Sequence, residues 1–360
     1  MSITIVVGTR PETIKMAPII RELKNQNIPF HFIHTGQHYD YSMSLQLIKE
    51  LNLPNPDHSF KLNNNKPASQ IGEMMTKLDP TLQNNKTKLL LIQGDTNTML
   101  AAALTGVKLG LKVGHIEAGL RSYDWRMPEE HNRRMVDHIS DLLFAPTETA
   151  KQNLIKERVY GKIYITGNTV IDAILQHMPL AEKHSKIMQT IQFKEYILAT
   201  LHRAENVDDT KTLKELIEAF MDSPIPIVFP VHPRTTKKLQ QLHILKKLEN
   251  SKKIQITPPL GYFDFLVLMK HCRIILTDSG GIQEEATAPN IRKPVLVLRL
   301  STERPEAVEA GFAKIVGVSK KNILEALNKS LNEPPTLPAC SPFGDGKASQ
   351  KIIRTIMEEI

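Results

Sequence analysis

The sequence has few cysteines and few aromatic residues, and each shortage excludes a class of protein. Its two cysteines, Cys272 and Cys340, stand alone in a chain of 360 residues. Isolated thiols suggest neither a disulfide framework nor a zinc site, so a reducing compartment is expected. Aromatic residues make up only 5% of the chain, and no basic stripe with interleaved aromatics occurs. A nucleic-acid partner is therefore not expected.

Two further features are missing. No apolar run approaches the roughly 20 residues that a membrane-spanning helix needs, and no basic leader precedes the strand-like segment Met1–Val7. These absences predict a soluble cytoplasmic protein with no membrane partner. No Gly-x-Gly-x-x-Gly motif follows the first predicted strand, which argues against a nicotinamide or flavin dinucleotide bound there.

What the chain does contain is enough for two domains. A hydrophobic content of 41% in 360 residues can bury two cores of ordinary size. The formal net charge of +8 fits an anionic small-molecule ligand, although it is equally compatible with no specific ligand.

Short apolar runs alternate with helical periodicity in two blocks. Six strands are predicted in the first block, at Ile3–Val7, His31–His34, Leu89–Ile92, Val113–Ile116, Leu142–Ala145 and Lys162–Thr166. Six more are predicted in the second block, at Tyr196–Thr200, Ile227–Val231, Ile254–Thr257, Ile274–Thr277, Val295–Leu298 and Ala313–Val316. The pattern predicts an α/β fold of two doubly wound Rossmann-like domains that face each other across a cleft. The expected domains are residues 1–168 and 169–342, followed by a helix within 343–360 that packs back on the first domain.

The segment Ile274–Ala286 predicts an anion site. Its apolar start indicates a buried strand, and Asp278–Gly281 indicates a sharp turn into a helix. Unpaired N–H groups at the helix start, the glycines and the Ser279 hydroxyl are suited to a diphosphate. Glu285 fits if it accepts hydrogen bonds from sugar hydroxyls. An ordinary strand-to-helix turn with a serine cap explains the same residues, and this alternative stays open.

Polar residues also follow the other predicted strands, at the edge where doubly wound sheets bind ligands. Arg10 and Lys15 could lie at this edge and contact a ligand. Taken alone, each is also explained as a charged side chain exposed to solvent. Glu129 and Glu130 lie in the first turn of a predicted helix. A favourable interaction with the helix dipole is enough to explain the presence of one of these two acids.

A series of motifs then occurs in one order along the chain. They are GTRPE at 8–12 with Lys15, QGDTNT at 93–98, HIEAGLRS at 115–122, PEEHNR at 128–133, HRAEN at 202–206, HPRT at 232–235, TDSGGIQEEA at 277–286 and TERPEAV at 302–308. Together they resemble the non-hydrolysing UDP-N-acetylglucosamine 2-epimerases over essentially the whole chain. The resemblance implies the glycosyltransferase-B fold, a homodimer, and neither a metal nor a redox cofactor.

The resemblance also implies a reaction and its residues. The reaction is reversible epimerisation at C2 of UDP-N-acetylglucosamine to UDP-N-acetylmannosamine, which supplies an activated amino sugar for surface polysaccharide or glycan synthesis. The catalytic residues by resemblance are Asp95, Glu117, Glu129 and His202. The substrate and UDP contacts are Arg10, Lys15, Arg234, Ser279, Gly280, Gly281, Glu285 and Arg304. Gln37 and His38 are candidate allosteric residues, because they lie where some members bind a second, activating substrate molecule.

The chemistry of such a substrate is consistent with this set of residues. C2 carries a hydrogen but no carbonyl, so simple enolisation is not available. Elimination of UDP from C1 as the C2 proton is removed gives 2-acetamidoglucal, and re-addition with a proton on the other face inverts C2. This route needs carboxylates that move protons and cations that bind the diphosphate. We hypothesise that proximity of the acids raises at least one pKa and divides acid and base roles.

Four alternatives remain at this point. A retaining glycosyltransferase of the same fold would use the same diphosphate site, but it would not need three acids at the strand ends of the first domain. A hydrolysing epimerase differs by admitting water, and a nucleotide-sugar sensor needs no catalytic set. Relatives that act on a C3-modified glucuronate-type sugar nucleotide resemble a Gly-x-Arg-Pro-Gln opening, whereas this chain has Glu12.

Overall fold

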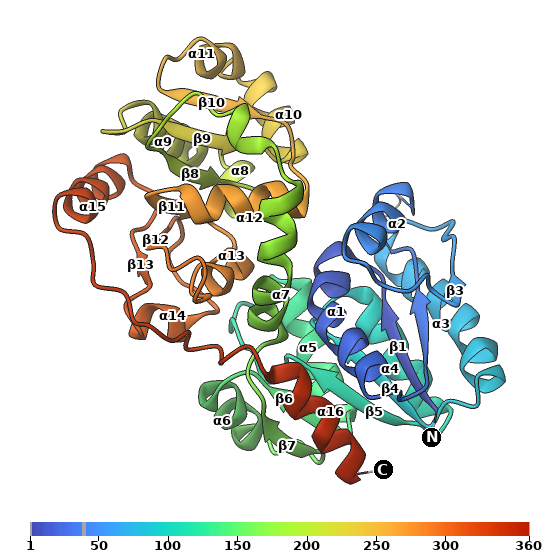
Figure 1. The fold of residues 1–360 in the computed structure, drawn as a ribbon. Coiled ribbons are helices and arrows are strands. Elements are labelled where there is room, and N and C mark those ends of the chain that lie inside the picture. The colour runs from blue at the N-terminus through green and yellow to red at the C-terminus, as the bar shows by residue number, and fades with distance from the viewer. Residues whose placement is uncertain (1, 38–40, 360) are drawn as a thin grey trace. The chain divides into compact units, whose positions relative to one another are not determined.

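The computed structural model describes residues 2–37 and 41–359. The chain divides into two compact units, which are described separately (Figure 1). Unit 1 comprises Met1–Ala173 and Phe343–Ile360, and unit 2 comprises Ile174–Pro342. Each unit holds one parallel sheet with helices between its strands, so the predicted α/β fold of two Rossmann-like domains is confirmed.

Within the described residues, unit 1 has a seven-stranded sheet in the order β3-β2-β1-β4-β5-β6-β7. Its strands are β1 (Ile3–Val7), β2 (Phe30–His34), β3 (His58–Ser59), β4 (Leu89–Gln93), β5 (Lys112–Ile116), β6 (Leu142–Ala145) and β7 (Lys162–Ile165). The prediction of six strands was wrong by one, because β3 is only two residues long and has no apolar run. The chain order reverses between β1 and β4, which is where sheets of this kind bind ligands beyond their carboxyl ends.

The helices of unit 1 alternate with these strands. They are α1 (Arg10–Asn25), α2 (Tyr41–Glu50), α3 (Pro67–Asn84), α4 (Asn97–Lys108), α5 (Pro128–Ile139), α6 (Glu148–Lys156) and α16 (Ala348–Glu359). Both β1 and β4 are buried along their whole length, as expected for central strands covered on both faces. The fully buried Ala101, Ala102 and Ala103 on α4 are small, which allows close packing of this helix.

Unit 2 repeats the same winding with a six-stranded sheet, in the order β10-β9-β8-β11-β12-β13. Its strands are β8 (Ile197–Thr200), β9 (Ile227–Pro230), β10 (Ile254–Thr257), β11 (Ile274–Thr277), β12 (Val295–Val297) and β13 (Ala313–Ile315). All six predicted strands are present, to within a residue at their ends. Helices α8 (Ala204–Val207), α9 (Thr210–Met221), α10 (Pro233–Gln241), α11 (Leu245–Glu249), α12 (Tyr262–His271), α13 (Gly280–Glu285), α14 (Pro305–Glu309) and α15 (Lys320–Asn332) complete the unit, with one 3-10 turn at Ile187–Gln189.

Helix α7 (Thr169–His184) contains the boundary between the units, and its first turn anchors the C-terminal helix within unit 1. The buried Asp172 carboxylate accepts the N–H groups of Ala348 at 3.1 Å and Ser349 at 2.8 Å, and the Ser349 hydroxyl at 2.7 Å. These bonds satisfy amide groups at the start of α16 that have no partner within the helix.

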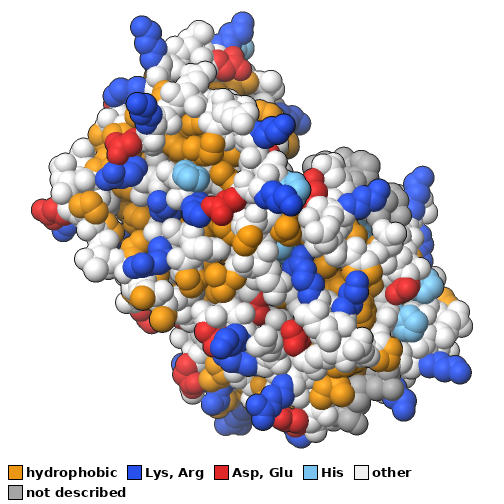
Figure 2. Space-filling view, viewed as in Figure 1, with side chains coloured by type: hydrophobic (Ala, Val, Ile, Leu, Met, Phe, Trp, Pro, Cys, Tyr) orange, Lys and Arg blue, Asp and Glu red, His pale blue; other side chains and the backbone are white. Residues whose placement is uncertain are grey.

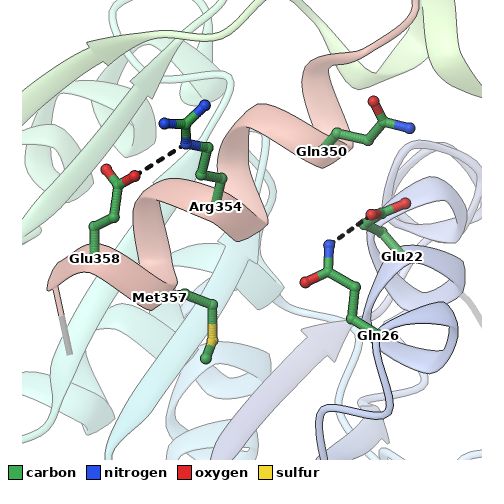
Figure 3. Close-up of a pocket in the computed structure, with 6 residues that line it drawn as sticks. All are labelled: Glu22, Gln26, Gln350, Arg354, Met357 and Glu358. Atoms are coloured by element: carbon green, nitrogen blue, oxygen red, sulfur yellow. Dashed lines mark hydrogen bonds and ion pairs between the residues drawn. The ribbon is translucent and has the colours of Figure 1, made fainter.

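Helix α16 packs against α1, and a groove runs along their junction (Figure 3). The groove is lined by Glu22, Gln26, Gln350, Arg354, Met357 and Glu358. The end of α16 is tied to the sheet by Glu359, whose carboxylate accepts hydrogen bonds from Lys162 at 2.6 Å and Tyr164 at 2.5 Å.

The surface and helices give two further observations. Among the described helices, none combines the length and apolar character needed to cross a membrane. On the face shown in Figure 2, Lys and Arg side chains are spread out and interspersed with Asp and Glu side chains.

Candidate active site

In unit 1, Glu117 and Lys15 form a buried ion pair. Glu117 directly follows β5, and the Lys15 ammonium of α1 donates to both of its carboxylate oxygens at 2.7 Å. The Gln93 side-chain amide donates to the same carboxylate, and Asn168 lies at 3.4 Å. Glu117 has a φ of +73°, a left-handed conformation that is uncommon for a residue other than glycine. Such conformations cost about 1–3 kcal/mol and cluster at functional sites.

Asp95 follows strand β4, which pairs with β5 so that Gln93 lies opposite Ile116. Asp95 and Glu117 therefore lie after neighbouring strands. Its carboxylate accepts a hydrogen bond from Arg133, and its backbone carbonyl accepts one from the Asn132 side chain at 2.9 Å. The start of α5 therefore fixes Asp95 at two points. Two of the three predicted catalytic acids thus lie at adjacent strand ends.

The two acids that open α5 have different environments. Glu130 is fully buried and accepts hydrogen bonds from the Ser122 backbone at 2.9 Å and from Arg133 at 2.9 Å. Burial alone would raise the pKa of Glu130, but the Ser122 hydrogen bonds and the charge of Arg133 outweigh it and lower the pKa. Glu129 is half-buried, and within the described part of the chain its side chain makes no hydrogen bond or ion pair. Glu130 therefore stabilises the segment before α5 and the first turns of that helix.

A buried network of hydrogen bonds and an ion pair connects β5 and the turn after β4 with helix α5. His115 lies between the Asp137 carboxylate, 2.7 Å from its Nδ1, and the Gly94 carbonyl oxygen, 2.8 Å from its Nε2. The Arg121 guanidinium lies 2.7 Å from the other Asp137 oxygen. Burial would raise the pKa of Asp137, but His115 and Arg121 outweigh it and keep the pKa below its usual range. The network ties the turn before Asp95 to α5.

In unit 2, His202 follows β8 and is held by Asp278, which follows β11. The His202 Nδ1 lies 3.1 Å from the Asp278 carboxylate, and the backbone N–H groups of His202 and Arg203 donate to the same group at 3.1 Å and 3.0 Å. Burial would raise the pKa of Asp278, but these hydrogen bonds and the charge of His202 lower it. A proton on Nδ1 directed at Asp278 leaves Nε2 for a ligand, in a side chain that is 35% exposed.

The predicted anion turn is built around a second buried acid, Glu303. Its carboxylate accepts hydrogen bonds from Arg203 at 2.9 Å and from Arg299. Burial would raise the pKa of Glu303, but the charges of Arg304, Arg299 and Arg203 outweigh it and lower the pKa to about 2. A Cβ at Gly280 would lie 2.5 Å from Glu303 Oε1, which explains why a glycine is required there.

Other predicted ligand residues differ in accessibility. Arg304 is 7% exposed, and its Nε donates to the buried Glu284 at 2.5 Å. Ser279 is the N-cap residue of α13, but its hydroxyl makes no capping hydrogen bond. Arg234 lies at the start of α10, after β9, and its exposed side chain donates hydrogen bonds to Asp208.

The candidate allosteric residues are only partly described. Gln37 accepts hydrogen bonds from the Thr98 backbone N–H and hydroxyl, both at 2.8 Å. His38 lies outside the described residues. The structure therefore connects Gln37 with the start of α4, two residues after the N-cap Thr96.

Sequence reasoning missed several residues of these sites, namely Gln93, Asn132, Arg133, Asp278 and Glu303. All of them lie inside the quoted motifs, near residues that were assigned. Position after a strand was the available signal for Asp278. Of the arginines around Glu303, Arg299 and Arg304 are close in sequence and Arg203 is 100 residues away, so the sequence does not show that all three meet at this acid.

Two Rossmann-like units, each with a parallel sheet between helices, are the architecture of glycosyltransferase-B-like enzymes. The profile of the family described as UDP-N-acetylglucosamine 2-epimerase matches residues 21–357. A Methanocaldococcus jannaschii protein named UDP-N-acetylglucosamine 2-epimerase is 44% identical over 365 residues, with 99% of each chain covered. The chain therefore belongs to the UDP-N-acetylglucosamine 2-epimerase family, a family of isomerases.

Two further similarities bear on the ligand. A crystal structure of a Methanocaldococcus jannaschii UDP-GlcNAc 2-epimerase in complex with UDP-GlcNAc and UDP superposes with a TM-score of 0.90 at 44% identity, covering 99% of this chain and 100% of that one. A Pseudomonas aeruginosa protein named UDP-2,3-diacetamido-2,3-dideoxy-D-glucuronate 2-epimerase is 35% identical over 363 residues, covering 98% of each chain.

Proposed function

We propose that this protein interconverts UDP-N-acetylglucosamine and UDP-N-acetylmannosamine by elimination and re-addition of UDP. The observation that carries the proposal is the Lys15–Glu117 ion pair at the end of β5, beside Asp95 at the end of β4. The 44% identity to a named epimerase over the full chain supports the same substrate.

The first step removes the C2 proton. A carboxylate of unit 1 takes that proton, the C2–H electron pair forms the C1=C2 bond, and the C1–O bond breaks with its electrons going to the UDP oxygen. The products are 2-acetamidoglucal and UDP. We assign proton transfer at C2 to Glu117, Asp95 and Glu129, of which Glu129 makes no side-chain hydrogen bond or ion pair within the described residues. Re-addition of UDP at C1, with a proton delivered to the opposite face of C2, completes the inversion.

The leaving diphosphate needs donors and positive charge as the C1–O bond breaks. We assign this role to His202 Nε2, to the Ser279–Gly281 turn and to Arg203, whose side chain is 24% exposed beside Glu303. Glu285 accepts hydrogen bonds from the ribose hydroxyls. Arg10, Lys15 and Arg234 are the further substrate contacts, and the buried Arg304 acts by ordering Glu284.

The protein acts as a homodimer in this proposal and supplies activated amino sugar for polysaccharide or glycan synthesis. The homodimer is carried over from the resemblance to the family, and the exposed Tyr123 (61%), Trp125 (57%) and Met135 (46%) of unit 1 are side chains that an interface would cover. Light scattering of the purified protein tests this part, and a monomer at micromolar concentration would contradict it.

The reaction is tested by proton NMR of the purified protein with UDP-N-acetylglucosamine in D2O, without added metal or nicotinamide. UDP-N-acetylmannosamine with deuterium at C2, and its absence in Glu117→Gln, is the expected result. Free N-acetylmannosamine with UDP would identify the hydrolysing reaction instead. Binding without any turnover would reject epimerisation of this sugar, and the same spectrum recorded with the 2,3-diacetamido glucuronate nucleotide would then test the second substrate class.

A further inference from the structure

Glu12 is a buried carboxyl group that the roles above leave unused. It is only 2% exposed, although it lies in the first turn of α1. Its Oε2 accepts the backbone N–H groups of Gly8 at 2.6 Å and Thr9 at 2.8 Å. Its Oε1 accepts the hydroxyl of Thr96, which is 84 residues away in sequence.

These contacts join the starts of two helices. Thr9 is the N-cap residue of α1 and forms a capping box with Glu12. Thr96 is the N-cap residue of α4, where its side chain accepts the Met99 N–H at 3.3 Å. A capping box needs the glutamate only for its own helix. Here the second carboxyl oxygen reaches the cap of another helix.

The joined segments carry the candidate catalytic groups of unit 1. Lys15 lies one turn after Glu12 on α1, and Asp95 directly precedes Thr96. The segments also approach closely, since a Cβ at Gly8 would lie 2.0 Å from the Thr98 hydroxyl oxygen. A carboxyl group at this junction therefore sets the spacing between the loop that carries Asp95 and the helix that carries Lys15.

We propose that Glu12 is a positioning residue, which fixes Asp95 relative to the Lys15–Glu117 pair by bonding the caps of α1 and α4 together. Its effect on turnover rests on the proposed function, whereas its effect on the two loops does not. Loss of the junction displaces a catalytic group, and a displacement of about 1 Å costs on the order of 100-fold in rate.

Geometry, rather than charge, is what the junction needs. Burial raises the pKa of Glu12 to about 7, although the hydrogen bonds from Thr96, Gly8 and Thr9 act to lower it. The neutral form of the carboxyl group is therefore populated near pH 7. A glutamine has the same shape: its oxygen accepts the two N–H groups and its amide donates to Thr96. Alanine removes all of these bonds.

The first test compares kcat and KM of Glu12→Ala and Glu12→Gln with the unmodified protein. We expect Glu12→Ala to lower kcat about 10- to 100-fold with KM changed by less than about 3-fold, and Glu12→Gln to restore most of kcat. Full kcat in Glu12→Ala would overturn the proposal. Equal loss in Glu12→Gln would also overturn it, because the charge would then be required.

The second test needs no turnover and measures amide hydrogen exchange in segments 8–13 and 94–99. Glu12→Ala is expected to speed exchange in both segments, and Glu12→Gln in neither. Faster exchange confined to 8–13 would overturn the junction. If the unmodified protein does not epimerise but this pattern holds, the proposed function fails and the junction stands. If Glu12→Ala does not fold, Thr96→Val against Thr96→Ser gives the same comparison, with the loss expected only in the valine variant.

Discussion

The Lys15 ammonium lies 2.7 Å from each carboxylate oxygen of Glu117, a residue 102 positions further along the chain. Both side chains are almost fully buried, with exposures of 12% and 4%. An ion pair removed from water in this way is sensitive to the loss of either partner, because the remaining charge is left unpaired.

Replacement of Lys15 by methionine is expected to lower the rate of C2 proton exchange by roughly 100- to 1000-fold, the usual effect of losing one preorganised electrostatic contact. The variant removes the charge beside Glu117 but keeps most of the side-chain length. Deuterium incorporation at C2 of the nucleotide sugar measures the effect. Lys24→Met, on an exposed position of the same helix, serves as the control. A rate within about 3-fold of the original would show that the ion pair plays no part in the reaction.

Asp278 is expected to matter for turnover more than for substrate binding. An asparagine there removes the carboxylate that orients His202 Nδ1, and changes of this kind lower kcat by as much as about 10,000-fold in hydrolases with an Asp–His pair. We expect Asp278→Asn to lower kcat at least about 100-fold with a smaller change in KM. Steady-state kinetics with the exposed Asp222→Asn as control measures this. A change confined to KM would assign Asp278 to nucleotide binding alone.

Glu12 is expected to make stability depend on pH. Its pKa rises from 4.5 to about 7 on folding because of burial, so the folded protein holds this proton more tightly than the unfolded chain. This stabilisation is fully present below about pH 4.5 and is lost as the pH rises to about 7. The size of the shift corresponds to about 3 kcal/mol.

Glu12→Gln carries no titrating proton, so its stability relative to the unmodified protein should increase as the pH rises from about 5 to 7.5. Urea unfolding at several pH values measures the difference in the free energy of unfolding. A difference independent of pH would show that Glu12 titrates normally in the folded protein.

Asp172 is expected to hold α16 in unit 1. Asp172→Ala leaves the Ala348 and Ser349 amides without their acceptor, and the loss of a helix cap costs about 0.5–2 kcal/mol. Thermal unfolding and limited proteolysis of residues 333–347 test this expectation. Asp345→Ala, which removes an exposed contact to Lys347, is the matched control. Equal effects of the two variants would mean that the buried carboxylate has no special role.

The sequence predicts strands and turns well, but it does not show which distant side chains meet. The apolar runs at 3–7 and 274–277 identify central strands correctly, whereas His58–Ser59 has no such run and was missed. Asp95 and Glu117 each follow a predicted strand, and the resemblance of their motifs to the family predicts their catalytic role. Their partners come from other elements: Arg133 starts from α5 and Lys15 from α1, and only the packing of these helices brings them to the strand ends. Glu303 follows this rule in part. Arg299 and Arg304 are its neighbours in sequence, whereas Arg203 is 100 residues away and reaches it only through packing.

The return of α16 to unit 1 has a consequence for how the chain folds during synthesis. Unit 1 begins to emerge from the ribosome first, but α16 (Ala348–Glu359) is made only after all of unit 2. Until then the nascent chain leaves the apolar face of α1 that α16 covers without its partner, together with the carboxylate of Asp172. The domain that starts first is therefore finished last, and a ribosome stalled within unit 2 presents an incomplete first domain to chaperones.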